Sequence, residues 1–190
     1  MTKGIIGKAL VKAVMSLREL YYTTINRIFL GLIWDLGKSC TFEGAIYVPA
    51  VKGNVKVGNN VRFGPFARIG ATEGAKIIIG DNVSVNQGSF IISRESIVIG
   101  NNTRVGEYVS IRDNDHEWRD KNTPILKQGF ITNSVEIGSD VWIGRNVVIC
   151  KGVKIGDGAV IGANAVITKN VNQYEVVVGN LGRVIKVRGE

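Results

Sequence analysis

The sequence predicts an all-β fold, a solenoid of short parallel strands with an N-terminal helical segment and one protruding loop. Three observations lead to this prediction. A six-residue repeat runs through most of the chain from about Val51, glycine is abundant at 24 residues against three prolines, and the repeat has one long interruption. Glycine supplies the left-handed backbone conformations that tight corners need, whereas proline would remove backbone donors from the strands.

The hexapeptide repeat is the strongest pattern in the chain. Each hexad opens with an aliphatic residue or Phe, which is usually followed by Gly. A period of six fits neither a helix nor one long strand, but it fits a triangular coil of three hexads, with coils stacked about 4.8 Å apart. We expect the opening residues to fill the interior. They are Val57, Phe63, Ile79, Val85, Ile99, Val105, Ile137, Ile143, Ile149, Ile155, Ile161 and Ile167.

Residues 4 to about 34 have a helical pattern, so we divide the chain into an N-terminal helical segment, 1–40, and a β-helix domain, 41–190. Five basic residues against Glu19 give residues 1–34 a charge of +4. Either the helix packs on the rest of the protein or a neighbouring subunit, or it lies on an anionic membrane. The apolar face comprises Ile6, Leu10, Ala13, Leu17, Leu20, Ile28 and Leu32.

The repeat stops between Ile111 and Val135, and this loop, 112–134, contains His116, the single histidine of the chain. Long polar excursions from compact domains are usually functional or disordered. An imidazole is the side chain best suited to general base catalysis near neutral pH. The neighbouring carboxylates of Asp113 and Asp115 are expected to orient it or to raise its basicity.

The net charge, the cysteines and the composition of the N-terminal segment exclude several classes of function. The net charge of +8 is spread along the chain and no nucleic-acid motif appears, so a nucleic-acid partner is not expected. Cys40 and Cys150 form neither a disulfide framework nor a metal-binding spacing, which indicates free thiols and no metal site. The start has no signal peptide and no apolar stretch long enough to span a bilayer, which favours a cytoplasmic protein.

The repeat resembles that of the hexapeptide-repeat acyltransferases, and the motif Val141–Gly144, read as VWIG after the loop, resembles the sugar and polysaccharide O-acetyltransferases related to maltose and galactoside acetyltransferases. The resemblance implies a left-handed β-helix, a homotrimer with sites between subunits, and polysaccharide biosynthesis. It also implies transfer of an acetyl group from acetyl-CoA to a sugar or glycan hydroxyl by direct attack, with no metal required.

By resemblance, His116 is the catalytic base. The acceptor site is expected to include Asn86, Asp113, Asp115 and Trp142. The residues that match the coenzyme A groove of the family are Gly144, Arg145, Ala163, Thr168, Lys169, Arg183 and Lys186. The chain departs from the family pattern where Trp118 and Arg119 occupy the region of a second histidine.

Three alternatives stay open at this point. The same base and groove would serve an N-acetyltransferase that acts on a nucleotide-linked amino sugar. A non-catalytic scaffold of the same fold would keep the coils but would need neither the histidine loop nor the basic C-terminal groove. Cys150 could carry the acyl group as a covalent nucleophile, although its place in a hexad is that of a turn or wall residue.

Overall fold

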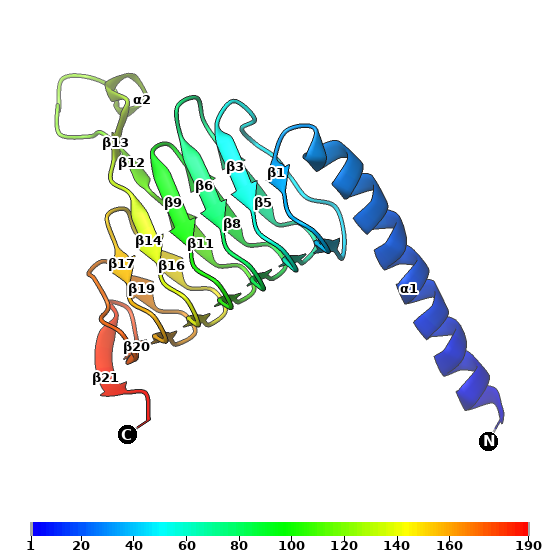
Figure 1. Cartoon of the computed structure of the whole chain (residues 1–190). Coiled ribbons are helices and arrows are strands. Elements are labelled where there is room, and N and C mark those ends of the chain that lie inside the picture. Colours follow the sequence, from blue (N-terminus) through cyan, green and yellow to red (C-terminus); the bar gives the residue numbers. More distant parts are fainter. Residues whose placement is uncertain (1, 190) are drawn as a thin grey trace.

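The computed structural model describes residues 2–189, and it is a triangular parallel β-helix whose three faces are three sheets (Figure 1). The first sheet contains β1 (Asp35–Leu36), β3 (Asn54–Val57), β6 (Lys76–Ile79), β9 (Ser96–Ile99), β14 (Val135–Ile137) and β17 (Lys154–Ile155). The second contains β2 (Thr41–Phe42), β4 (Arg62–Phe63), β7 (Ser84–Val85), β10 (Arg104–Val105), β15 (Trp142–Ile143), β18 (Val160–Ile161), β20 (Glu175–Val178) and β21 (Arg183–Val187). The third contains β5 (Arg68–Ala71), β8 (Phe90–Ser93), β11 (Ser110–Arg112), β16 (Val148–Ile149) and β19 (Val166–Ile167).

The buried core confirms the hexapeptide prediction. Every predicted opening residue, from Val57 to Ile167, is at most 3% exposed. The matching residues of the third sheet in the early coils, Ile69, Ile91 and Ile111, are fully buried as well, and each follows the opening residue in the second sheet by six places. The spacing lengthens only on the way back to the first sheet, where β5 and β8 are four residues long.

The coils turn at three corners. We call the turns from the first to the second sheet corner 1, those from the second to the third sheet corner 2, and those from the third back to the first corner 3. At corner 1, Asn60, Asn82 and Asn102 adopt φ of 55°, 57° and 59°, and their side-chain amides form a ladder at 3.2 and 3.1 Å. Asn tolerates this left-handed backbone, which is why it alternates with Gly in the repeat.

The helix α1 (Thr2–Gly31) projects away from the coils and contacts them only near its C-terminal end (Figure 1). Leu30 and Trp34 are buried against the first coil, where Phe42 stacks on Phe63 at 5.1 Å. β1 already pairs with β3, so the strand pairing of the first sheet begins at residue 35, within the segment 1–40 that the sequence analysis assigned to the helix. No helix in the described part of the chain has the length and apolarity required to cross a membrane.

The predicted loop leaves the coils at corner 3. It forms an antiparallel hairpin of β12 (Asn114–His116) and β13 (Phe130–Thr132), with α2 (Ile125–Gln128) at its tip (Figure 1). The chain then returns to the solenoid in register, because Val135 of β14 pairs with Ile97 of β9. The hairpin is therefore an addition to an unbroken stack of coils.

Candidate active site

Asp113 fixes the base of the hairpin. Its side chain is fully buried and accepts hydrogen bonds from Ser93 Oγ at 2.6 Å, from the backbone N–H groups of Arg94 at 2.8 Å and Glu95 at 2.9 Å, and from Asn114 Nδ2 at 3.1 Å. Burial by itself would raise the pKa of this carboxyl, but the hydrogen bonds outweigh it and lower the pKa. Asp113 thus holds the base of the hairpin in place. Its buried side chain does not face an acceptor, as the sequence analysis had expected it to.

His116 lies exposed on β12, at the pair that it forms with Phe130. The two rings are 4.4 Å apart, and the guanidinium of Arg94 lies 3.4 Å from the centre of the Phe130 ring on which the imidazole packs. Asp115 forms an ion pair with Lys151 at 2.7 Å. Among the described residues, no hydrogen bond joins either neighbouring carboxylate to the imidazole, so an aromatic contact holds the ring in place of the expected acidic one.

Cys150 lies at corner 3, close to Asp115. Burial raises the pKa of its thiol, and the charge of Asp115 raises it further. Since the thiolate is the nucleophilic form of cysteine, both effects act against a covalent acyl-carrying role.

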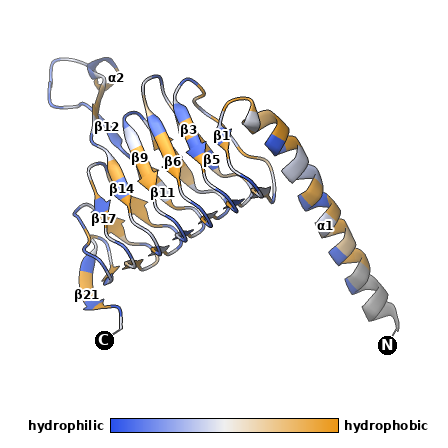
Figure 2. Ribbon diagram, viewed as in Figure 1, coloured by the Kyte–Doolittle hydropathy of each residue, from blue (hydrophilic) through white to orange (hydrophobic). Residues whose placement is uncertain are grey.

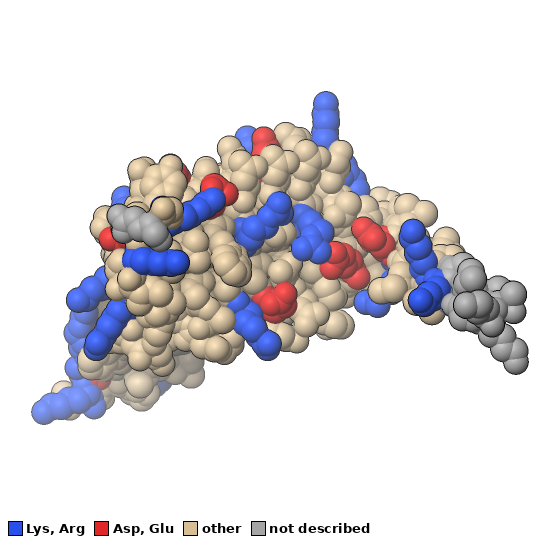
Figure 3. Space-filling model, turned by 90° about the horizontal axis from the view of Figure 1, so that it is seen from below, with Lys and Arg blue, Asp and Glu red and all other residues tan. Residues whose placement is uncertain are grey.

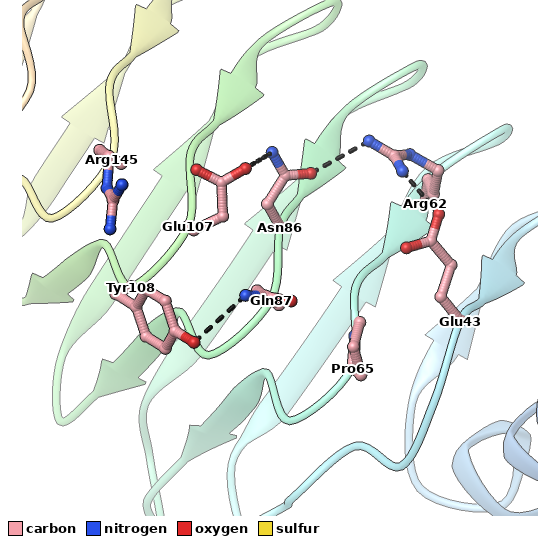
Figure 4. Close-up of a pocket in the computed structure, with 8 residues that line it drawn as sticks. All are labelled: Glu43, Arg62, Pro65, Asn86, Gln87, Glu107, Tyr108 and Arg145. Carbon is pink, nitrogen blue, oxygen red and sulfur yellow. Dashed lines mark hydrogen bonds and ion pairs between the residues drawn. The ribbon is translucent and has the colours of Figure 1, made fainter.

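Asn86 lines a polar pocket of about 550 Å³ on the second sheet and corner 2 (Figure 4). Its Oδ1 accepts a hydrogen bond from Arg62 at 3.0 Å, and its Nδ2 donates to Glu107 at 3.3 Å. Arg62 also pairs with Glu43 at 2.6 Å. The pocket therefore presents charged donors and acceptors next to one another, as a polyhydroxylated ligand would require.

The sequence prediction missed most of the residues around Asn86, although the repeat contained a signal for them. Gln87 and Glu107 stand at the third place of hexads that open in the second sheet, as does Arg145, which was predicted for the coenzyme A groove and also lines this pocket. Stacked coils put equal hexad positions side by side, so an alignment of hexads would have grouped these residues. Tyr108, whose hydroxyl accepts a hydrogen bond from Gln87 at 3.1 Å, follows at the next place.

Several of the predicted coenzyme A residues share corner 2 or the second sheet. Gly144 is buried, and a Cβ there would lie 2.7 Å from the backbone nitrogen of Ala163, so this glycine permits close stacking of two coils. Arg145, which follows Gly144 in the chain, and Ala163, against which Gly144 stacks, are both exposed. Arg183 and Lys186 are exposed on β21. Thr168 and Lys169 instead lie after β19, at corner 3.

Trp142 is 60% exposed on β15, beside Arg104 and Val160 in the second sheet. It lines a separate hollow near corner 1, with Asp140 and Arg188.

The predicted site residues thus form two groups separated by the third sheet. One group lies on the second sheet and corner 2: Asn86, Trp142, Gly144, Arg145, Ala163, Arg183 and Lys186. The other lies at corner 3: Asp113, Asp115, His116, Thr168 and Lys169. A single chain does not bring His116 to the Asn86 pocket.

The surface charge agrees with the sequence pattern. Lys and Arg side chains are scattered over the face seen in Figure 3 and are interrupted by acidic side chains. Within residues 2–189, no ion pair engages Arg145, Arg183 or Lys186. These three cations are therefore available to an anionic ligand.

Comparisons with known proteins identify the family. The model of the bacterial transferase hexapeptide (six repeats) matches residues 134–169. Over 141 residues the chain is 33% identical to WbbJ of Escherichia coli K12, whose name assigns it to lipopolysaccharide biosynthesis as an O-acetyl transferase; the match covers 70% of this chain and 72% of WbbJ. The chain belongs to the bacterial hexapeptide-repeat transferases, and the predicted family is confirmed.

Two solved structures show the same fold. The S84A mutant of AntD, an N-acyltransferase from Bacillus cereus in complex with a nucleotide-linked amino sugar and coenzyme A, has a TM-score of 0.73 at 21% identity and covers 87% of this chain and 90% of its own. The polysialic acid O-acetyltransferase OatWY has a TM-score of 0.66 at 22% identity, with 82% and 75% covered.

Proposed function

We propose that this protein transfers an acetyl group from acetyl-CoA to a hydroxyl of a sugar or glycan, with His116 as the general base. The observation that carries the proposal is the position of the single histidine, exposed on an antiparallel hairpin that leaves an otherwise regular solenoid. The relationship to WbbJ supports O-acetylation and a role in the synthesis of surface polysaccharides.

A hydroxyl is a weak nucleophile at neutral pH, so a base must remove its proton as it attacks. In the proposed reaction, a ring nitrogen of His116 accepts this proton while the hydroxyl oxygen bonds to the acetyl carbonyl carbon. The C–S bond of the thioester then breaks, and the proton passes to the departing coenzyme A thiolate. The imidazole packs on the ring of Phe130, which in turn contacts the guanidinium of Arg94, and the buried Asp113 holds the base of the hairpin that carries the histidine. Such positioning removes rotational freedom before the reaction begins.

The Asn86 pocket suits the acceptor. Sugar hydroxyls both donate and accept hydrogen bonds, and the carboxylates of Glu43 and Glu107 can accept from them while the amide of Asn86 and the guanidinium of Arg62 can donate. The pocket is open and polar, as binding of part of a larger glycan would require.

The residues at corner 2 and β21 fit coenzyme A. Acetyl-CoA supplies an activated acetyl thioester and carries phosphates at its other end. Ala163 has no side chain beyond Cβ, which leaves room for the thiol arm along the corner. Arg145, Arg183 and Lys186 are exposed cations outside any ion pair of the described residues, and such groups bind phosphates.

A homotrimer would assemble the two groups of residues. The third sheet separates His116 from the Asn86 pocket, and its outer surface carries Phe90, Ile92, Val148 and Val166, which are only partly buried in the single chain. If this surface packs against neighbouring copies, the hairpin of one subunit lies beside the second sheet of the next. The active sites are then formed between subunits.

N-acylation of a nucleotide-linked amino sugar is the second candidate, because AntD shares the fold. The two candidates differ in the bond that is formed. Mild alkali hydrolyses an acetyl ester but leaves an acetamide intact, so treatment of the labelled product distinguishes them.

The test is an acceptor screen with radiolabelled acetyl-CoA, which compares the wild type with His116→Ala. We expect turnover to fall about a hundredfold or more, since general base catalysis contributes that much. Lys121→Ala, an exposed change on the same hairpin, is the matched control and should leave turnover unchanged.

Two results would contradict the proposal. The first is full turnover by His116→Ala. The second is the absence of any thermal stabilisation by saturating acetyl-CoA, which would favour a scaffold protein.

A further inference from the structure

The apolar side of α1 is uncovered. A row of residues at three- and four-residue steps is 45–67% exposed along the helix, although a packed helix would bury such a row. Figure 2 shows the apolar residues recurring along the described part of α1. Of the alternatives for this helix, packing on its own chain is therefore excluded for this row, and Ile6 of the predicted face lies outside the described side chains. The row comprises Leu10, Val14, Leu17, Tyr21, Ile25 and Ile28.

The opposite side of α1 attaches the helix to the coils. Thr23 exchanges hydrogen bonds with the backbone of Phe42 at 3.3 and 3.0 Å, Asn26 donates to the carbonyl of Gly44 at 3.0 Å, and Leu30 is fully buried. Lys8 and Lys12 lie on this same side by helical periodicity. The orientation of α1 is thus fixed by its last turns, with the apolar row directed away from the protein.

The breadth of the exposed surface indicates what covers it. Val11, Leu20 and Phe29 flank the row on its two sides and are 57–63% exposed, so the apolar surface spans roughly 180° of the circumference at about 3.6 residues per turn. A coiled-coil contact with a second copy would need only a narrow seam. A wide apolar face suits the interfacial region of a bilayer.

The charges of α1 point to the same partner. Lys8, Lys12, Arg18 and Arg27 stand against Glu19 alone. Juxtamembrane Lys and Arg side chains are attracted to an anionic membrane surface. Arg18 lies on the flank of the apolar surface that carries Val11, so its long side chain can direct the charge to the headgroups while its stem lies along apolar surface. Lys8 and Lys12, on the opposite side, and Arg27, which donates to the carbonyl of Cys40 at 3.3 Å, contribute only through the positive field of the helix.

The helix stands beside the pocket that contains Asn86. Met15, Arg18 and Glu19 line a hollow of about 410 Å³, and its other walls include Pro65 and Gln87, which also line the Asn86 pocket. Whatever surface α1 binds is therefore brought close to this pocket.

We propose that α1 binds the surface of an anionic membrane, with its apolar row in the headgroup region and the β-helix outside it. The membrane contact stands without the proposed function. A second consequence rests on the proposed function. The acceptor glycan would then be presented to the Asn86 pocket at the membrane surface.

The test is flotation of the purified protein with vesicles, in the absence of acetyl-CoA and acceptor. We expect binding to phosphatidylcholine vesicles that contain phosphatidylglycerol, weaker binding to phosphatidylcholine alone, and a loss of affinity as salt screens the charges. Leu17→Asp should weaken binding about tenfold or more, because a buried Leu contributes that much. Ser16→Asp adds the same charge on the polar side and should change affinity less than threefold.

Either of two outcomes would overturn the proposal. One is equal weakening by Leu17→Asp and Ser16→Asp, which would reduce the effect to net charge. The other is that the wild type binds neither kind of vesicle and that Leu17→Asp changes the sedimentation coefficient of the protein. That result would mean that α1 is buried between copies of the chain. Neither result depends on catalysis, so failure here is separable from failure of the acetyltransferase proposal.

Discussion

Asp113 and His116 lie on the same short stretch of chain but have opposite environments. The carboxylate is buried among four donors, whereas the imidazole is exposed and rests on an aromatic ring. The sequence favoured equivalent roles for the acidic neighbours of the histidine. Asp113 faces the turn at Arg94 and accepts hydrogen bonds from it, whereas His116 lies on β12 beside Phe130. The local composition shows neither arrangement.

Asp113→Asn should lower the free energy of unfolding by about 2–3 kcal/mol, because the amide presents a donor where the backbone of Arg94 and Glu95 already donates. The lowered pKa of Asp113 stabilises the fold above the unfolded-state pKa of about 3.9, and this contribution is lost as the pH falls through that value toward the folded-state pKa. Unfolding of the variant should therefore depend less on pH in that acidic range.

Chemical denaturation across a pH series measures both effects. Asp115→Asn is the control, since it removes only an exposed ion pair with Lys151, worth about 0–1 kcal/mol. Equal stability of the Asp113 variant and the wild type would contradict the structural role.

Cys150→Ala should retain at least about a third of wild-type turnover. Burial and the charge of Asp115 raise the pKa of the thiol, so little thiolate is available for a covalent step near neutral pH. A loss comparable to that of His116→Ala, measured in the same acetyl-transfer assay, would restore the covalent mechanism.

At the scale of elements, the strands and corners of the coils were the most predictable features. Each opening residue of a hexad fills the interior, and Asn or Gly takes the left-handed corner, so local sequence determines local structure. Phe66 and Tyr108 adopt the same positive φ at corner 2, and their residue types give no warning of it. There the neighbouring coils impose the conformation.

The helix and the hairpin were predictable in position but not in surroundings. Periodicity located α1, yet it could not tell which part of the apolar face meets the coils, because that depends on Thr23 and Asn26 reaching backbone groups of the first coil. Likewise the loop 112–134 was identified by the interruption, but its antiparallel pairing and the contact between His116 and Phe130 join residues that no repeat relates.

At the scale of the whole molecule, the separation of His116 from the Asn86 pocket leads to a test of shared active sites. If the proposed homotrimer forms, chains carrying His116→Ala and chains carrying Asn86→Ala should each have little activity, because every site then lacks one of the two residues. When the two are unfolded, mixed and refolded together, each mixed trimer should contain one site with both residues intact, so activity returns to a substantial fraction of the wild type.

The control is a mixture of the two preformed variants without refolding, which should stay inactive. Refolded mixtures that also stay inactive would place both residues in a site within a single chain.

The direct pairing of β9 with β14 has a consequence for how such proteins diversify. Since the coils close beneath the hairpin without a change of register, the segment between Arg112 and Val135 can be lengthened, shortened or exchanged while the scaffold is preserved. The segment is then portable, and it could be grafted between relatives without redesign of the core.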